Sequence, residues 1–325
     1  MTTEVKLNST VEAVQTTRYA ALNAGAPPLD GRAVEVTQSI LPEWTSYLFA
    51  AVTLLGEAWI FVPVLALAYW FGDAERIAPL FGLVFGGLAL IVVFKSLFAL
   101  PRPPTEAMIP PEAAHESIRS AYAWAIHSDG YGFPSGHTVG AVVMWGALAL
   151  RLHVGTPTVR IGVAVTLVFL AALSRLALGV HYLADVIGGF VIGLVLLLAW
   201  LAALDHVTRP VELSLGAGIC CAILPLLLGV GGSEPLYALG AISGALLAWT
   251  FVGPPGTRFD RTVSDIGVGF AGVVWFLGAG ITVGILIPGA VGSVLMTAVM
   301  GLAIFTWPHA VGRLRSWFAR AVAAS

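Results

Sequence analysis

The sequence predicts an all-α fold, a polytopic transmembrane bundle of about nine helices. Hydrophobic residues make up 58% of the 325 residues and charged residues only 10%, whereas soluble domains carry about 25% charged residues. The chain contains a series of apolar runs of about 18–25 residues. Each run is long enough to cross about 30 Å of hydrocarbon. The alternating pattern of a membrane barrel is absent, and a helix satisfies its own backbone groups in lipid.

The composition also excludes several classes of protein. A net charge of −2 leaves no basic field for nucleic acid, so no nucleic-acid partner is expected. The two cysteines, Cys220 and Cys221, are adjacent, which fits neither a disulfide between them nor a zinc site. We interpret both as packing residues.

The elements follow in order along the chain. Residues 1–42 form a polar tail in which Thr10–Ala24 resembles a weak surface helix, and Pro27–Pro28 would break it. The start lacks the apolar core of a secretory signal peptide. Nine apolar candidates then follow: 45–71, 77–100, 134–151, 159–174, 182–204, 213–231, 236–252, 264–287 and 289–307.

The polar stretch 101–133 interrupts this series. Its first part, 101–111, contains five prolines, and a more helical piece follows around Glu112–Ile126. Loops of this length are usually functional or disordered. We expect 43–212 to be a catalytic transmembrane core that includes this loop, and 213–325 to be an accessory block of about four helices with a C-terminal tail.

The distribution of cations predicts an orientation. With nine spans, the termini lie on opposite sides. One side receives Arg76, Arg151, Arg160, Arg209, Arg258, Arg261, Arg313, Arg315 and Arg320, and the other receives Lys6, Arg18, Arg32 and Arg119 besides three motif cations described below. The first side is therefore predicted to be cytoplasmic. The N-terminus and the 101–133 loop would lie outside the cell membrane, and the C-terminus inside.

The first chemical motif pairs Lys95 with Arg102, at the end of the second run. On a continuous helix, seven residues place both cations on one face, about 10 Å apart, although Pro101 would disturb the last turn. Such residues are costly inside an apolar segment and mark functional sites. The plainer alternative is that both side chains extend to the membrane interface.

The second motif, Pro-Ser-Gly-His, places Ser135, Gly136 and His137 at the start of the third run. Free N–H groups at a helix N-terminus suit an oxyanion, and a histidine can move a proton near neutral pH. A simple serine N-cap is the alternative interpretation.

The third motif contains Ser174, Arg175, His181 and Asp185. His181 and Asp185 are four residues apart, so they share one helix face. A carboxylate there can hold one ring nitrogen and leave the other free to attack, while the Arg175 fork suits an anion. The alternative is a purely structural pair.

With the spans above, all three motifs face the same side. Cations and N–H groups together form a phosphate cradle, and paired histidines suit a nucleophile and a general acid. The acidic cluster that magnesium would need is missing. We therefore expect neither a metal nor another cofactor.

The pattern Lys-x6-Arg-Pro, Pro-Ser-Gly-His, Ser-Arg-x5-His-x3-Asp resembles that of the type 2 phosphatidic acid phosphatases, over about residues 45–205. These are integral-membrane lipid phosphate phosphatases related to vanadium haloperoxidases. The resemblance implies a phosphatase-type helical core, and it says nothing about the later spans.

The resemblance also implies roles for individual residues. His181 would form a phospho-histidine, Asp185 would orient it, and His137 would protonate the leaving alcohol and then activate water. The phosphoryl oxygens would be held by Lys95, Arg102, Arg175, Ser135 and Gly136.

Second-tier candidates lie around these motifs. Glu57 sits within the first apolar run, where a carboxylate is costly, and would pair with Lys95 or contact a head group. His127 lies just before the second motif and could shape the entrance, or form a solvated loop pair with Asp129. Ser174 precedes the motif arginine.

The leading hypothesis is a metal-independent lipid phosphatase in the bilayer. Its substrate would be a lipid phosphate or diphosphate of isoprenoid, phosphatidate or phosphatidylglycerophosphate type. A lipid phosphotransferase with the same site, or a non-catalytic lipid carrier or scaffold, remain open. Small residues such as Gly240-x3-Gly244 could pack helices within one chain or in a homo-oligomer.

Overall fold

The computed structural model describes residues 31–105, 107–256, 258–260 and 262–323, and all regular elements in these ranges are helical. The helix expected at Thr10–Ala24 lies outside them. Part of the expected polar tail forms helix α2, Arg32–Ile40. Its Val34 is fully buried against Leu176 and Val186, so the end of this segment packs on the bundle.

Each apolar run corresponds to a helix or a broken helix. The first run is bent by 53° at residue 57, between the pair α3 and η1 and the following α4. The boundaries are α3 Thr45–Val52, η1 Thr53–Gly56, α4 Ala58–Phe71, α5 Ala74–Phe98, α7 Gly136–Arg151, α8 Pro157–Ala177, α9 Leu183–Leu204, α10 Pro210–Leu227, α11 Glu234–Val252, α12 Val263–Leu286 and α13 Gly289–Ala323.

These helices make the chain a multi-pass membrane protein. Among the described residues, seven helices are long and apolar enough to cross a bilayer, or eight if the bent pair is one span. Helix α7 has 16 residues and is short for a span of about 20 residues. The predicted count of nine spans is therefore not confirmed.

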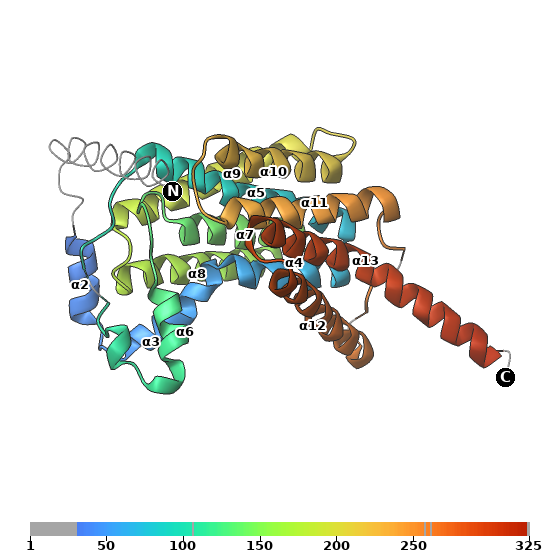
Figure 1. Cartoon of the computed structure of the whole chain (residues 1–325), viewed down its shortest axis with the longest axis horizontal. Coiled ribbons are helices and arrows are strands. Elements are labelled where there is room, and N and C mark those ends of the chain that lie inside the picture. Colours follow the sequence, from blue (N-terminus) through green and yellow to red (C-terminus); the bar gives the residue numbers. More distant parts are fainter. Residues whose placement is uncertain (1–30, 106, 257, 261, 324–325) are drawn as a thin grey trace.

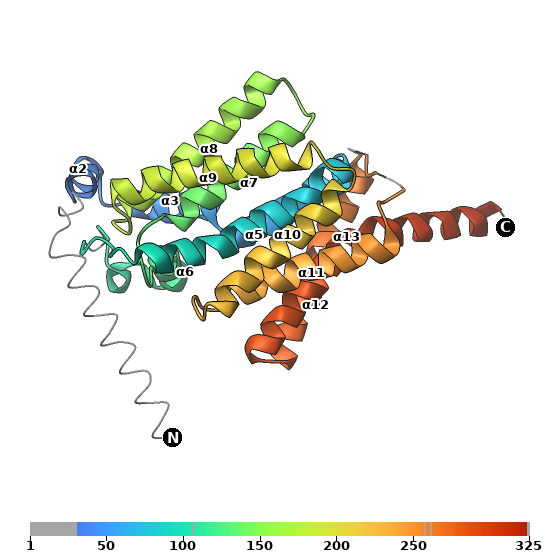
Figure 2. The same ribbon diagram turned by 90° about the horizontal axis from the view of Figure 1, so that it is seen from above.

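Helix α5 lies at the centre of the bundle. It packs against α7 on one side and against α10 and α11 on the other. Helices α8 and α9 lie beyond α7, while α12 and α13 lie beyond α11 (Figure 2). The core is continuous across these layers, so the expected catalytic core and accessory block share one hydrophobic interior.

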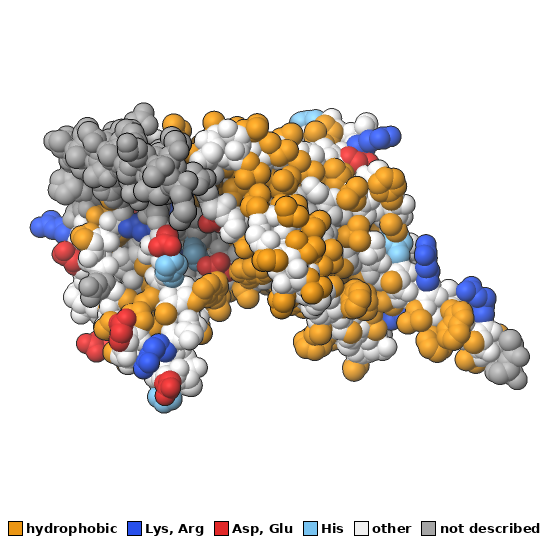
Figure 3. Space-filling view, in the orientation of Figure 1, with side chains coloured by type: hydrophobic (Ala, Val, Ile, Leu, Met, Phe, Trp, Pro, Cys, Tyr) orange, Lys and Arg blue, Asp and Glu red, His pale blue; other side chains and the backbone are white. Residues whose placement is uncertain are grey.

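The surface fits a bilayer. Charged side chains gather toward the two ends of the long axis, and hydrophobic side chains cover most of the face between them (Figure 3). One end carries α2, α3 and α6, Glu116–Ile126 (Figure 1). Helix α6 confirms the helical piece expected in the 101–133 loop, where a short 3₁₀ turn, η2 Pro111–Ala113, precedes it.

Two boundaries differ from the expectation. Helix α5 ends at Phe98 because Ala99 adopts a left-handed conformation, with φ 48°, so Arg102 lies in a loop and not on the helical face of Lys95. Helix α13 continues to Ala323, beyond the predicted end of its span at residue 307, so the described part of the C-terminal tail is helical.

The Gly240-x3-Gly244 motif packs α11 against α13 within the chain. A Cβ atom at Gly240 would lie 2.2 Å from the carbonyl oxygen of Val294, and one at Gly244 would lie 2.0 Å from that of Ala298. The absence of these side chains lets the two backbones approach closely, as small residues do in membrane bundles.

Candidate active site

His181 and Asp185 form a buried pair where α8 turns into α9. Nδ1 of His181 lies 3.2 Å from Oδ2 of Asp185, and the same oxygen accepts a hydrogen bond from the backbone N–H of Tyr182 at 2.9 Å. The exposed fractions of the two side chains are 2% and 0%. The carboxylate therefore holds the imidazole ring in one orientation.

The second nitrogen of His181 contacts a cation. Its Nε2 lies 3.0 Å from a terminal nitrogen of Arg102. A guanidinium has only N–H donors, so Nε2 accepts this hydrogen bond and carries a lone pair, and the ring proton sits on Nδ1 facing Asp185. Burial, followed by the charges of Arg175 and Arg102, lowers the pKa of His181 well below its ordinary value of 6.5. The imidazole of His181 is thus neutral near pH 7 and has its lone pair on Nε2.

Three cations surround this nitrogen, and neutral oxygens hold them. Nζ of Lys95 donates to the carbonyl of Tyr131 at 2.7 Å. Arg102 donates to three backbone carbonyls, those of Asp129, Gly130 and Val180. The remaining cation, Arg175, donates to Thr53 Oγ1 at 2.6 Å.

Carboxylates in the described part of the chain act on these cations from a distance and not through direct ion pairs. Among the described residues, none of Lys95, Arg102 and Arg175 forms an ion pair with a carboxylate. Arg175 is 2% exposed, and its Nε has no hydrogen-bond partner. A buried cation without a counter-ion is costly, and a bound anion would remove that cost. The site is therefore suited to a phosphate group.

His137 is held from the other side by Glu57. Nε2 of His137 lies 2.8 Å from Oε1 of Glu57. Glu57 stands at the bend between η1 and α4, and Gly56 allows this approach because its Cβ atom would lie 2.8 Å from that of His137. The predicted partner of Glu57, Lys95, is not the one that the structure shows.

The Pro-Ser-Gly-His segment starts helix α7. Ser135 is buried, and its Oγ accepts from the backbone N–H and the hydroxyl of Thr138; its own N–H donates to the carbonyl of Asp185 at 3.0 Å. This last bond joins the second and third motifs. Ser135 thus caps the helix and does not line the cavity, whereas Gly136 does.

The remaining second-tier residues have different surroundings. Ser174 is buried and donates to the carbonyl of Ala171, away from the cavity. His127 pairs with Asp129 at 2.7 Å, and their side chains are 65% and 84% exposed. This is the solvated loop pair considered above, and it lines the mouth of the cavity.

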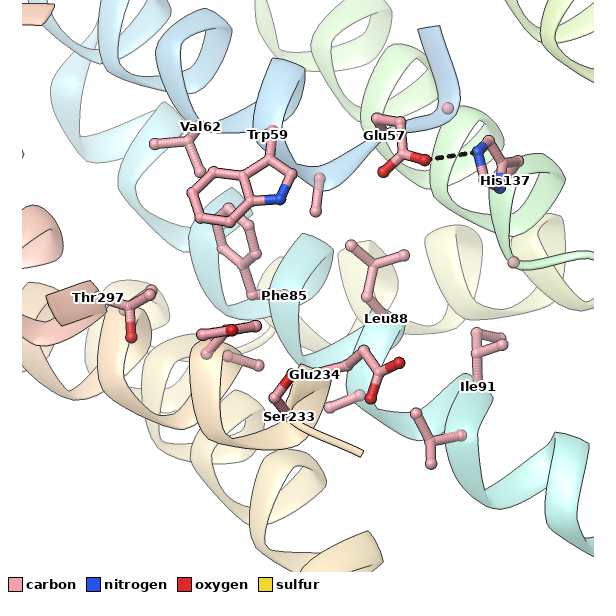
Figure 4. A pocket seen from close by; sticks show the side chains of 18 of the residues that line it. Glu57, Trp59, Val62, Phe85, Leu88, Ile91, His137, Ser233, Glu234 and Thr297 are labelled. Carbon is pink, nitrogen blue, oxygen red and sulfur yellow. Dashed lines mark ion pairs between the residues drawn. The ribbon is translucent and has the colours of Figure 1, made fainter. Parts of the chain in front are cut away.

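A cavity of about 530 Å³ brings the motifs together. Figure 4 shows Glu57 and His137 on one side of it, and Ser233, Glu234 and Thr297 on another. The predicted site residues that line the cavity are Glu57, Lys95, Arg102, His127, Gly136, His137, Arg175 and His181. Asp185 lies behind His181, and Ser135 and Ser174 face away.

Sequence reasoning missed several contributors. Thr53, which holds Arg175, is a common residue in an apolar run and gives no signal. The carbonyls that hold Lys95 and Arg102 cannot be identified from side-chain chemistry. Helices α11 and α13 also line the cavity. The sequence could not indicate this, because the last motif ends at Asp185.

The fold and site together define a multi-pass membrane protein with two histidines and three cations around one cavity. Residues 76–209, which include all three motifs, match the model of the PAP2 superfamily. That part of the chain is similar to this superfamily. The expected phosphatase-type helical core is thereby confirmed.

One curated relative supports the same assignment. The chain is 33% identical over 87 residues to phosphatidylglycerophosphatase B of Bacillus subtilis (strain 168), and the aligned part covers 25% of this chain and 43% of the relative. The chain thus spans less than half the length of that protein. No solved structure matches the chain significantly.

Proposed function

We propose that this protein is a membrane lipid phosphatase that hydrolyses a lipid phosphate or diphosphate through a phospho-histidine at His181. The observation that carries the proposal is the pair of contacts on His181. Asp185 holds Nδ1–H and Arg102 donates to Nε2, so the ring presents a lone pair where three cations converge. The superfamily match and the relative's name favour the same activity.

In the first step, Nε2 of His181 attacks phosphorus, and the bond from phosphorus to the leaving oxygen breaks. His137 donates a proton to that oxygen. Glu57 lies 2.8 Å from Nε2 of His137 and would hold the ring for this transfer. In the second step, water attacks the phospho-histidine, the P–N bond breaks, and His137 accepts the water proton. Inorganic phosphate then leaves.

Lys95, Arg102, Arg175 and the N–H of Gly136 would stabilise the equatorial oxygens of the transition state. Arg102 must shift its donor from Nε2 to a phosphoryl oxygen as substrate enters. Ser135 acts on this cradle through the cap of α7, because its hydroxyl is engaged there. No step in this scheme draws on a metal or other cofactor.

The substrate belongs to one of three types: isoprenoid diphosphate, phosphatidate or phosphatidylglycerophosphate. The name of the Bacillus relative adds weight to the last. The arginine distribution supports a site on the outer side of the cell membrane, with the N-terminus outside and the C-terminus in the cytoplasm. We divide the chain into a catalytic core, 43–212, and an accessory membrane block, 213–325.

The test is phosphate release by purified protein in vesicles containing each lipid type, with a chelator present and His181→Ala as control. We expect chelator-resistant release that the variant loses, with acid-labile phosphate trapped on wild type. Transfer of the phosphoryl group to an added alcohol without release of phosphate would instead favour a phosphotransferase. Folded wild-type protein that acts on none of these lipids would contradict the proposal.

A further inference from the structure

The cavity does not end at the cations. It continues between α4, α5, α11 and α13 as an apolar arm, which we define by Val62, Phe85, Leu88, Ala241, Met300 and Ile304. We propose that this arm holds one hydrocarbon chain of the substrate, and that α11 and α13 thereby select the chain. The inference rests on the proposed function, because it assigns the phosphate of the same lipid to the cation end.

The direction of the arm matches that of a lipid. Lys95 and Phe81 both lie on α5 and line the cavity. The two residues are fourteen positions apart on the helix, so the cavity extends about 21 Å along the helix axis. That is about two thirds of the hydrocarbon thickness of a bilayer. A lipid phosphate likewise has its head group near the surface and its chain along the membrane normal.

The lining of the arm is apolar and contains small residues. Figure 4 shows Val62, Phe85 and Leu88 directed toward this space. Thr297 on α13 is a polar exception, but its hydroxyl donates to carbonyls of its own helix, 3.0 Å from that of Ser293. Glu234, at the first turn of α11, is exposed, so the deeper part presents no unpaired charge to a chain.

The far end of the arm is closed by packed aromatic rings. Phe81 contacts Phe305 edge to face, with centroids 5.0 Å apart, and Phe305 stacks on Tyr69 at 4.6 Å. All three side chains are at most 2% exposed. Because tightly packed interiors resist compression, this floor sets a limit on the length of chain that fits.

The wall formed by α11 and α13 lies outside residues 76–209, which match the superfamily. Its spacing is set by close backbone contact, since a Cβ atom at Gly301 would lie 2.2 Å from the carbonyl oxygen of Ala241. Lipid tails are as apolar as this wall, so the arm gains little from burial alone. It selects chains by shape.

The experiment compares a short, water-soluble phosphate monoester with single-chain lipid phosphates of increasing length, at fixed mole fraction in vesicles. Ala241→Phe would fill the arm, and Leu247→Phe places the same side chain on α11 where the native residue is 51% exposed. We expect Ala241→Phe to lower kcat/KM for long chains about tenfold or more, as pocket mismatches do. The short ester and the Leu247→Phe control should be unaffected.

Met300→Ala provides a second variant, which widens the arm and should raise turnover of branched isoprenoid chains relative to straight ones. An unchanged ratio of long-chain to short-chain kcat/KM in Ala241→Phe would overturn the inference. A lipid phosphate with a photoreactive group at its chain end supplies a readout without turnover. Crosslinks to peptides of α11 or α13 that Ala241→Phe abolishes support the arm even if wild type hydrolyses nothing. Crosslinks confined to bilayer-facing residues, or to a second copy of the chain, contradict it.

Discussion

Nε2 of His181 lies 3.0 Å from a terminal nitrogen of Arg102, and this contact decides which ring nitrogen carries the proton. The guanidinium also donates to the carbonyl of Val180 at 2.9 Å, one residue before the histidine. The cation is therefore tied to the same turn as the nucleophile. In the proposed mechanism, an entering phosphate competes with His181 for this donor, so that binding of the anion also releases Nε2 of His181 for attack.

Asp185→Asn tests the assignment of the proton. The amide can present an N–H to Nδ1 and would favour the wrong tautomer, with the proton on Nε2. We expect kcat to fall by about 10³-fold or more with little change in KM, by analogy with carboxylate-oriented histidines in general. Single-turnover measurement of the phospho-enzyme should show slow formation. Normal formation with slow hydrolysis would contradict this role.

Arg102→Lys tests the cradle. Lysine keeps the charge but lacks the planar fork, and it cannot donate to His181 and several carbonyls at once. We expect kcat/KM to fall by about 10²-fold, and phosphate or vanadate inhibition to weaken in parallel. Arg119→Lys is a matched control, because Arg119 on α6 donates to the carbonyl of Ala114 and is not among the residues that line the cavity. This variant should leave both values unchanged.

The pH profile follows from the low pKa of His181. Attack requires the neutral ring, so activity is lost as pH falls through this pKa, and the acid limb of kcat/KM should lie below pH 6.5. Arg102→Gln removes a cation that opposes protonation, so the pKa of His181 rises and the limb should move to higher pH. The substrate's own ionisation is the same for both enzymes, so the difference between their profiles isolates the effect. A limb at unchanged pH would refute the electrostatic cause.

Glu57→Gln tests whether the carboxylate positions His137. We expect kcat for a lipid alcohol leaving group to fall about tenfold to a hundredfold, with a much smaller effect on an aryl phosphate, whose leaving group needs no proton. In a His137→Ala background, Glu57→Gln should cost little more, since the two residues act together. Additive losses would indicate a structural role alone.

Gly56→Ala tests the close contact between the broken first span and α7. The new Cβ would lie 2.8 Å from that of His137 and 2.9 Å from its carbonyl oxygen, so the backbone must move and Glu57 with it. We expect lower kcat and a lower Tm. Gly87→Ala is the control, because its Cβ would meet nothing within 4 Å and alanine favours a helix. Equal behaviour of the two variants would argue against the contact.

The sequence predicted the membrane bundle well because each apolar run, read alone, must be helical in lipid. It also grouped the three motifs correctly, since Lys95, His137 and His181 do line one cavity. It wrongly placed Arg102 on the helical face of Lys95. The helix ends at a left-handed Ala99, and no glycine at that position indicates this end in the sequence. It missed the partnership of Glu57 with His137, which depends on a bend between distant segments.

The carbonyls that hold Lys95 and Arg102 come from the loop before α7 and from the turn before α9. The path of the main chain therefore sets the positions of both charges. The side chains of Asp129 and Tyr131 can change without moving either charge, whereas Gly130, with φ 65°, and the buried Val180 are constrained by the path itself. The shortening of this loop by a single residue would displace both. We therefore expect this loop to tolerate substitution of its side chains but not the deletion of a residue.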